Sequence, residues 1–177
     1  DKNLKKILDL NGFSKTPRKV GKKKLADELQ NGEILFRGLN GEGSKQYANQ
    51  FYNGEMYVGI GFGGNGVYMS REINEADNYT KGSNTVVVAV IPKNMKIAGK
   101  DVRKEYNEFY ERQKAKAENT KQEKERSYKI QRTMSFGSYC ALKGYDAYLP
   151  TISPEKNMVV LNRGKLFVGE NNEQERI

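Results

Sequence analysis

The stretch GGNGVYMS, residues 63–70, places three glycines within four positions, directly before an aromatic and a hydroxyl residue. Glycine lets the backbone turn tightly or approach another group closely. The residues that follow, Val67 to Ser70, have the composition of a short β-strand. The stretch therefore predicts a strand, a glycine loop and a second strand over residues 55–70, with Tyr68 and Ser70 available to a ligand beside the loop.

The composition favours an anionic partner. The chain of 177 residues carries 31 Lys and Arg against 22 Asp and Glu, and its isoelectric point is near 9.4. Such a surplus is typical of proteins that bind nucleic acid, a nucleotide or an acidic surface. Solvated lysines without a partner are the alternative. The length fits one domain, or one domain with an appendage.

The residue types that are missing exclude several chemistries. The chain has no histidine, which excludes Ser-His-Asp and Cys-His nucleophiles and His-ligated metals. The single cysteine, Cys140, allows no internal disulfide, and its surroundings GSYCALKG predict a structural thiol in a buried helix. No apolar run approaches 18 residues and no signal peptide is visible, so we expect a soluble intracellular protein.

The order of the predicted elements indicates an α+β fold built on antiparallel or mixed sheets. Helices and strands do not alternate regularly, and the continuously apolar TVVVAVIP, residues 85–92, predicts the central strand. We expect an N-terminal helical segment over residues 1–30, a main domain over 31–170 and a polar tail over 171–177.

Within the main domain, residues 101–132 are dense in Lys, Glu, Arg and Gln. Their apolar stripe is thin, being limited to Val102, Tyr106, Phe109 and Tyr110. This pattern predicts a charged helical insertion, either a solvated hairpin or a partly disordered segment. A surface for nucleic acid or for a protein partner is the alternative.

Two tyrosines have the spacing of a ring-binding slot. Tyr79, in the helical pattern EADNYTKG, follows Tyr68 by eleven positions. Two parallel rings about 7 Å apart would hold a flat heteroaromatic group by stacking. The backbone of Gly38, at the end of the strand pattern LFRG, could pair with an amide on that ring. Nicotinamide has both the ring and the amide.

From Ile34 to Val168 the sequence resembles ADP-ribosyltransferase domains, most closely those at the C-terminus of phage head-morphogenesis (minor capsid) proteins. In such domains the first core strand ends in Arg or His followed by Gly, and a Gly-rich turn then leads into a strand with an aromatic and a Ser or Thr. The matching segments, in chain order, are Arg37-Gly38, GGNGVYMS, EADNYTK, TVVVAVIPKNMKI and ALKGYDAYLP followed by MVVLNRGKLFV.

The resemblance implies split antiparallel or mixed sheets around an NAD cleft, with NAD as substrate and no metal. Arg37 would grip the phosphate or ribose, because its guanidinium fork pairs with two oxygens. Gly38 would bond the carboxamide, Gly66 would leave room for the dinucleotide, and Tyr68 and Tyr79 would hold the ring. Ser70 would orient Arg37 or the ribose.

Each of these residues also has a plainer interpretation. Tyr68 could be an ordinary core aromatic, Arg37 could form a surface ion pair, and Ser70 could cap the helix that follows it. Five motifs in the matching order favour the ligand-binding interpretation over these alternatives.

The chain departs from the family at its carboxylate. Most active relatives carry Glu at the start of the last motif strand, often as Glu-x-Glu, where this chain has Asn157. An amide bonds a ribose hydroxyl but cannot offset a developing positive charge. Glu155 lies two positions earlier on a loop with Thr151 and Ser153, and Asp146 lies in GYDAY. Either Glu155 supplies the carboxylate, or Asn157 acts weakly, or the domain binds NAD without efficient turnover.

We therefore expect an NAD-dependent mono-ADP-ribosyltransferase that cleaves the nicotinamide–ribose bond and modifies a protein side chain, by family habit an arginine. A phage origin would place it in the virion or the bacterial host cytoplasm, with capsid or portal proteins as partners and no membrane contact. The alternatives are a catalytically weak or inactive structural domain of a virion protein, and a basic module that binds nucleic acid.

Overall fold

The computed structural model describes residues 3–54, 59–61, 64–116, 125, 129–130 and 134–170. Across these residues the fold is α+β with a mixed sheet, as the sequence predicts. Two strand pairs are parallel, β1 with β9 and β6 with β7, and the others are antiparallel. In these same segments no helix is both long and apolar enough to cross a membrane.

The strands form one continuous path in the order β1-β9-β5-β2-β4-β8-β7-β6, and β3 pairs with β4 beside it. The bounds are β1 Arg18–Val20, β2 Glu33–Leu39, β3 Gly59–Gly61, β4 Gly64–Ser70, β5 Thr85–Ile91, β6 Ile97–Ala98, β7 Ala147–Tyr148, β8 Asn157–Val160 and β9 Phe167–Gly169.

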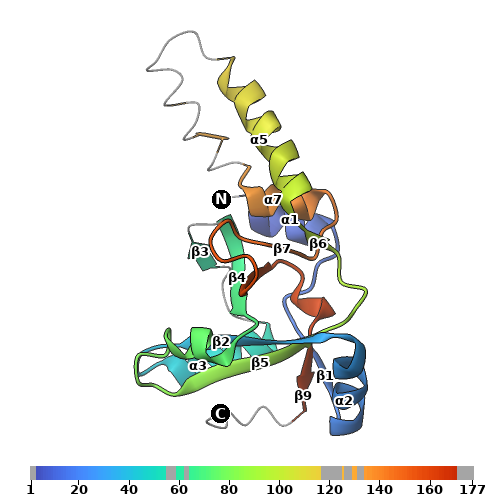
Figure 1. Ribbon diagram of the computed structural model, residues 1–177, viewed down its shortest axis with the longest axis vertical. Coiled ribbons are helices and arrows are strands. Elements are labelled where there is room, and N and C mark those ends of the chain that lie inside the picture. The colour runs from blue at the N-terminus through green and yellow to red at the C-terminus, as the bar shows by residue number, and fades with distance from the viewer. Residues whose placement is uncertain are drawn as a thin grey trace.

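The sheet is divided into two halves at the contact between β2 and β4. These strands share a single register pair, Phe36 opposite Ser70. By contrast, β2 pairs with β5 along its whole length, and β4 pairs with β8 from Val67 to Ser70. In Figure 1, β2 and β5 run across the lower part of the molecule and β4 rises away from them. The strands therefore diverge on one side of this junction.

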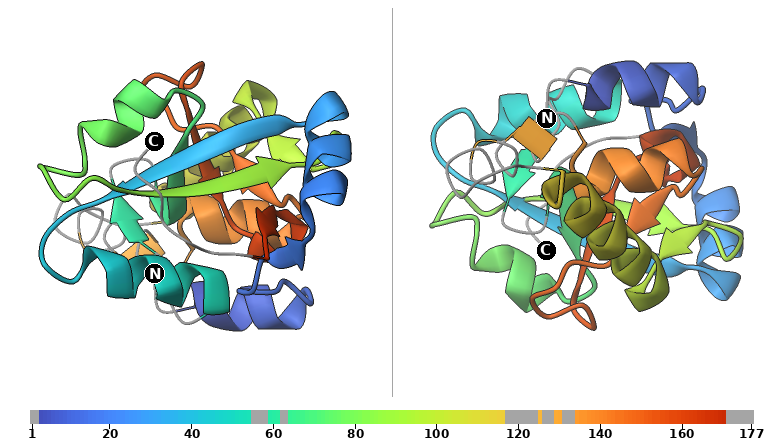
Figure 2. Two further views of the ribbon diagram at one scale, coloured as in Figure 1. Left: turned by 90° about the horizontal axis from the view of Figure 1, so that it is seen from below. Right: turned by 90° about the horizontal axis from the view of Figure 1, so that it is seen from above.

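The predicted central strand is confirmed. β5 lies between β2 and β9 and is buried at six of its seven positions. Its run of β-branched residues suits a strand covered on both faces, because each face must contact other elements. Helix α3 (Ser44–Asn53) covers one face of the β2–β5 pair and α4 (Ile73–Asp77) covers the other (Figure 2).

Three helices cover the other half of the sheet. They are α1 (Leu4–Leu10), α5 (Lys100–Lys114) and α7 (Phe136–Leu142), and they pack together over Tyr148 and Val159. Elsewhere in the described segments lie the helix α2 (Lys22–Asn31) and the single turn η1 (Arg163–Lys165). The predicted structural thiol is confirmed, since Cys140 is fully buried in α7 and burial raises its pKa to about 12.

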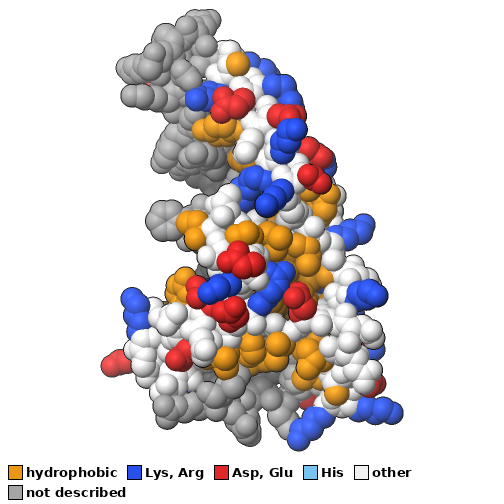
Figure 3. Space-filling view, in the orientation of Figure 1, with side chains coloured by type: hydrophobic (Ala, Val, Ile, Leu, Met, Phe, Trp, Pro, Cys, Tyr) orange, Lys and Arg blue, Asp and Glu red, His pale blue; other side chains and the backbone are white. Residues whose placement is uncertain are grey.

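The charged segment is anchored more firmly than a solvated insertion would be. Val102 and Tyr106 of α5 are buried against α7, and the Tyr106 hydroxyl donates to the Met134 carbonyl at 2.8 Å. Ile130 is also buried. Farther along, α5 projects from the body with both charge signs on its surface (Figures 1 and 3). Residues 117–124, 126–128 and 131–133 lie outside the described residues, as does the tail 171–177, so these domain boundaries stay predictions.

The expected strand, glycine turn and second strand are present as the β3–β4 hairpin, although the connecting residues 62–63 lie outside the described residues. β4 begins at Gly64, and Gly61 pairs with Gly64 in the β3–β4 hairpin. Gly64 and Gly66 therefore belong to the β3–β4 ladder.

Gly38 tests how tightly α4 is held against β2. A Cβ there would lie 1.9 Å from the Ala76 carbonyl oxygen, whereas nothing lies within 4 Å of a Cβ at Gly99. We predict that Gly38→Ser lowers the free energy of unfolding by at least about 2 kcal/mol in chemical denaturation, because α4 must move away. Gly99→Ser, at the N-cap of α5, should cost nothing. Equal stability of the two variants would contradict this packing.

Candidate functional site

The strand order brings three expected site residues, Arg37, Ser70 and Asn157, into one region. Phe36, Ser70 and Asn157 lie opposite one another on β2, β4 and β8, forming a row across the junction. Arg37 follows Phe36 directly, at the point where β2 and β4 separate. Residues that are far apart in sequence thus meet at the division between the two halves of the sheet.

Arg37 bridges the gap between the diverging strands with its side chain. Its Nη1 donates to the Tyr68 carbonyl at 2.7 Å, which replaces a main-chain bond at a position where the ladder has ended. Its Nε is buried and has no hydrogen-bond partner among the described residues. Burial lowers the pKa of the guanidinium. No carboxylate in the described part of the chain pairs with Arg37, so the surface ion-pair interpretation is not supported.

Gly38 is a point of close backbone approach. The Ala76 carbonyl and the Thr80 side chain occupy the space that a Cβ would need. The glycine therefore lets α4 lie directly on β2, which positions the segment that carries Tyr79. This packing alone explains why the residue at position 38 is glycine.

Ser70 uses its hydroxyl on the main chain. The Oγ donates to the Lys156 carbonyl at 3.1 Å and accepts from the Glu72 amide at 3.1 Å. The hydroxyl therefore joins β4 to the loop before β8. Its bond with the Glu72 amide shapes the turn into α4, which is close to the predicted alternative role of Ser70 as a helix cap. Arg37 is instead oriented by the Tyr68 carbonyl, so its orientation by Ser70 is not seen.

The two tyrosines have different surroundings. Tyr68 packs against the cluster formed by α1, α5 and α7, and its side chain hydrogen-bonds the Tyr148 hydroxyl. Arg103 lies nearby, with its guanidinium carbon 3.4 Å from the centre of the Phe136 ring. Tyr79 is 61% exposed after α4. Tyr68 is thus partly a core aromatic, while Tyr79 is open to a ligand.

The reason for a glycine at position 66 differs from the expected one, which was space for a dinucleotide. A Cβ at Gly66 would lie 2.3 Å from Cγ1 of Val159 on the neighbouring strand β8. The backbone φ of +156° is also one that other residues rarely adopt. Packing between β4 and β8 therefore accounts for this glycine, and space for a dinucleotide is not needed to explain it.

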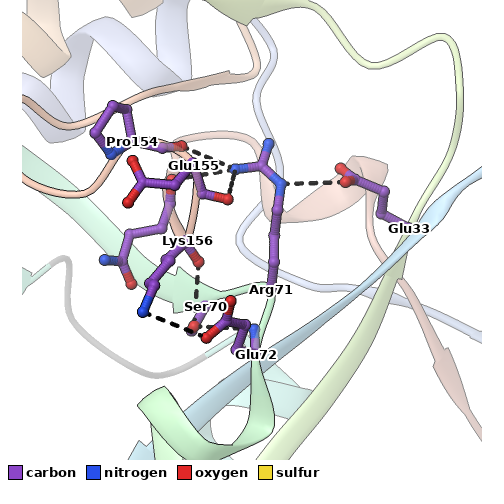
Figure 4. A network of polar contacts seen from close by, with 8 residues as sticks. Glu33, Ser70, Arg71, Glu72, Pro154, Glu155 and Lys156 are labelled. Atoms are coloured by element: carbon purple, nitrogen blue, oxygen red, sulfur yellow. Dashed lines mark hydrogen bonds and ion pairs between the residues drawn. The ribbon is translucent and has the colours of Figure 1, made fainter.

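The loop before β8 is held by Arg71, which the sequence analysis missed. Its Nε donates to the Glu33 carboxylate at 3.1 Å, and its Nη1 donates to the Pro154 carbonyl at 3.0 Å (Figure 4). Lys156 forms a longer, exposed ion pair with Glu72, at 3.6 Å. The only sequence signal for Arg71 was its position next to Ser70, because its partners lie far away along the chain.

Glu155 and Asn157 differ in how they are held. The Asn157 Nδ2 donates to the Ser153 carbonyl at 3.4 Å, and its side chain is half-buried. Glu155 is exposed, and its carboxylate points away from Arg71 in Figure 4. Its carbonyl accepts weakly from Arg71 Nη1 at 3.5 Å, but its carboxylate has no hydrogen bond or ion pair among the described residues. Glu155 therefore has the less constrained side chain of the two and the one open to a ligand.

Asp146 has a structural role. Its buried carboxylate accepts from the Lys96 amide and from Nδ2 of Asn162, both at 3.0 Å. These bonds tie β6, β7 and the turn after β8 together. This carboxylate is already committed and is not available for catalysis. Among the described residues no group of His, Cys, Asp or Glu side chains could hold a metal ion.

Comparison with protein-family models, with curated proteins and with solved structures gave no match. The resemblance to ADP-ribosyltransferase domains therefore stays a prediction that rests on the order of the motifs.

The Arg71 contacts generate a test of loop rigidity. We predict that Arg71→Gln speeds amide exchange at Lys156 and Asn157 by about tenfold or more, because charge-assisted hydrogen bonds contribute roughly 1.5–3 kcal/mol each. Lys156→Gln removes only the exposed pair with Glu72, so its effect should stay below about 1 kcal/mol. Unchanged exchange in Arg71→Gln would show that the loop is held by other contacts.

Proposed function

We propose that the protein is an NAD-dependent mono-ADP-ribosyltransferase whose NAD site lies where β2 and β4 diverge. The observation that carries the proposal is the row Phe36, Ser70 and Asn157 with Arg37 in the gap beside it. The family resemblance expects its Arg, Ser and Glu motifs on neighbouring core strands of a split sheet. The three motif segments of this chain do lie on adjacent strands.

The chemistry at this place matches what bond cleavage in NAD needs. Breaking the nicotinamide–ribose bond leaves positive charge on the ribose, so a nearby carboxylate lowers the barrier. Arg37 has a buried Nε–H without a partner among the described residues, which can donate to a phosphate or ribose oxygen. Tyr79 offers an exposed ring to the nicotinamide, whereas Tyr68 is packed against the cluster of α1, α5 and α7.

Glu155 is the group we propose as the carboxylate. It is exposed and uncommitted, whereas the Asn157 amide is engaged by Ser153 and Asp146 by Lys96 and Asn162. Arg71 fixes the main chain of the loop at Pro154 without holding the Glu155 side chain. The acceptor would be a protein side chain, by family habit an arginine, in a virion or bacterial host cytoplasm.

A second candidate is a structural domain of a virion protein that binds NAD without turnover. The observation that favours it is the amide of Asn157 in the row where active relatives carry a carboxylate. Nothing comparable favours nucleic-acid binding, because acidic and basic side chains mix along the described part of α5 (Figure 3).

The proposal predicts that purified protein releases free nicotinamide from NAD. Glu155→Gln should lower the rate by about 100-fold, the usual scale for losing one electrostatic stabiliser. Glu111→Gln, an exposed acid on α5, serves as the matched control and should leave the rate unchanged. Protection of the protein by NAD against thermal unfolding, without nicotinamide release, would identify the inactive alternative. Absence of both protection and release would refute the proposal.

A companion prediction concerns Asn157. Asn157→Asp keeps the side-chain shape and adds a carboxylate opposite Ser70, so nicotinamide release should rise above that of the natural protein. The double variant Asn157→Asp with Glu155→Gln should then retain activity. If Asn157→Asp lowers release while Glu155→Gln has no effect, the assignment of the carboxylate to Glu155 is wrong.

A further inference from the structure

Asparagine followed directly by glycine occurs at five places in the chain, and this pair has a chemistry of its own. The main-chain nitrogen of the glycine can attack the side-chain carbonyl carbon of the asparagine, since no Cβ hinders the approach. The attack requires a main chain that can bend into a ring, so hydrogen bonds and packing within a fold slow it. The pairs are Asn11-Gly12, Asn31-Gly32, Asn40-Gly41, Asn53-Gly54 and Asn65-Gly66.

In two of the pairs both reacting groups are held by hydrogen bonds. The Asn11 Nδ2 donates to a carbonyl of α1 at 2.8 Å, and the Gly12 amide donates to another carbonyl of α1 at 3.1 Å. The Asn53 Oδ1 accepts from Lys19 Nζ at 3.0 Å, and the Gly54 amide donates to a carbonyl of α3 at 3.3 Å. Each attack would have to break two hydrogen bonds.

Two further pairs are held by regular structure. Asn31 is the last residue of α2, and a Cβ at Gly32 would lie 2.0 Å from the Ile91 carbonyl oxygen, so the main chain is closely packed there. Asn65 and Gly66 both belong to the β3–β4 ladder. Neither main chain can bend into a ring without opening a helix end or a strand pair.

The pair Asn40-Gly41 differs from the other four. It lies in the connection between β2 and α3, and both residues are exposed. Nothing lies within 4 Å of a Cβ at Gly41, whose φ is +80°. Neither the Asn40 side chain nor the Gly41 amide is hydrogen-bonded to any described residue. The amide, the attacking nitrogen and the space around them are therefore all available.

We propose that Asn40 is a site of spontaneous deamidation in the folded protein. The Gly41 nitrogen bonds to Cγ of Asn40, the bond from Cγ to Nδ2 breaks, and ammonia leaves with the proton from the glycine nitrogen. Water then opens the resulting succinimide at either carbonyl and gives aspartate or isoaspartate. One water is consumed, one ammonia is released, and nothing is oxidised. The product carries a new negative charge three positions after Arg37. The reaction needs no NAD, so the inference is independent of the proposed function.

The test is incubation of the purified full chain in mildly alkaline buffer, followed by peptide mass spectrometry and isoaspartate-specific methylation. Conversion at Asn40 should be at least about tenfold faster than at each of the other four asparagines, because the attack there breaks no hydrogen bond. Gly41→Ala adds a Cβ next to the attacking nitrogen and should slow conversion at Asn40 to the level of the held pairs.

The same chain incubated in denaturant is the matched control. Unfolding frees all five pairs, so their rates should become similar there if the fold causes the difference. Conversion in the folded chain that is no faster at Asn40 than elsewhere would overturn the inference. The same preference for Asn40 in the denatured chain would also overturn it, because neighbouring residues in sequence would then decide the rate. If Gly41→Ala fails to fold, the folded and denatured natural chains still decide the matter.

Discussion

The structure depends on one short contact, the single pair Phe36–Ser70 that joins β2 to β4. Because pairing ends there, the two halves of the sheet diverge and the Tyr68 carbonyl would lose a main-chain partner. The Arg37 side chain takes that place at 2.7 Å. A long cationic side chain is thereby drawn into the interior at the division of the sheet. The burial of the Arg37 guanidinium at the candidate site follows from this substitution of a side chain for a ladder hydrogen bond.

The surroundings of the junction are built from contacts between distant segments. Gly38 lets α4 lie on β2, Gly66 lets β8 lie on β4, and Ser70 with Arg71 ties both to the loop before β8. These contacts hold the main chain closely while leaving the side chains of Glu155 and Tyr79 exposed. A rigid frame with a few uncommitted side chains is the usual arrangement at binding sites on a scaffold.

The sequence predicted what periodicity and local composition control. The α+β class, the central strand at 85–91 and the burial of Cys140 are confirmed, because apolar runs and the absence of polar partners report burial directly. The sequence did not predict the roles of residues whose contacts lie far away along the chain. Gly66 faces Val159, and Arg71 reaches Glu33 and Pro154, neither of which a local pattern can reveal. The mixed charges of residues 101–132 likewise hid the anchoring of α5 by Tyr106.

The central claim is that a dinucleotide enters the division between β2 and β4. Amide hydrogen exchange with and without NAD tests it most directly, because it locates binding whether or not turnover occurs. We predict slower amide exchange with NAD over residues 37–39, 67–71 and 73–80, and no change in α2 or β9 on the other side of β5. Protection confined to α5, or no protection anywhere, would contradict it.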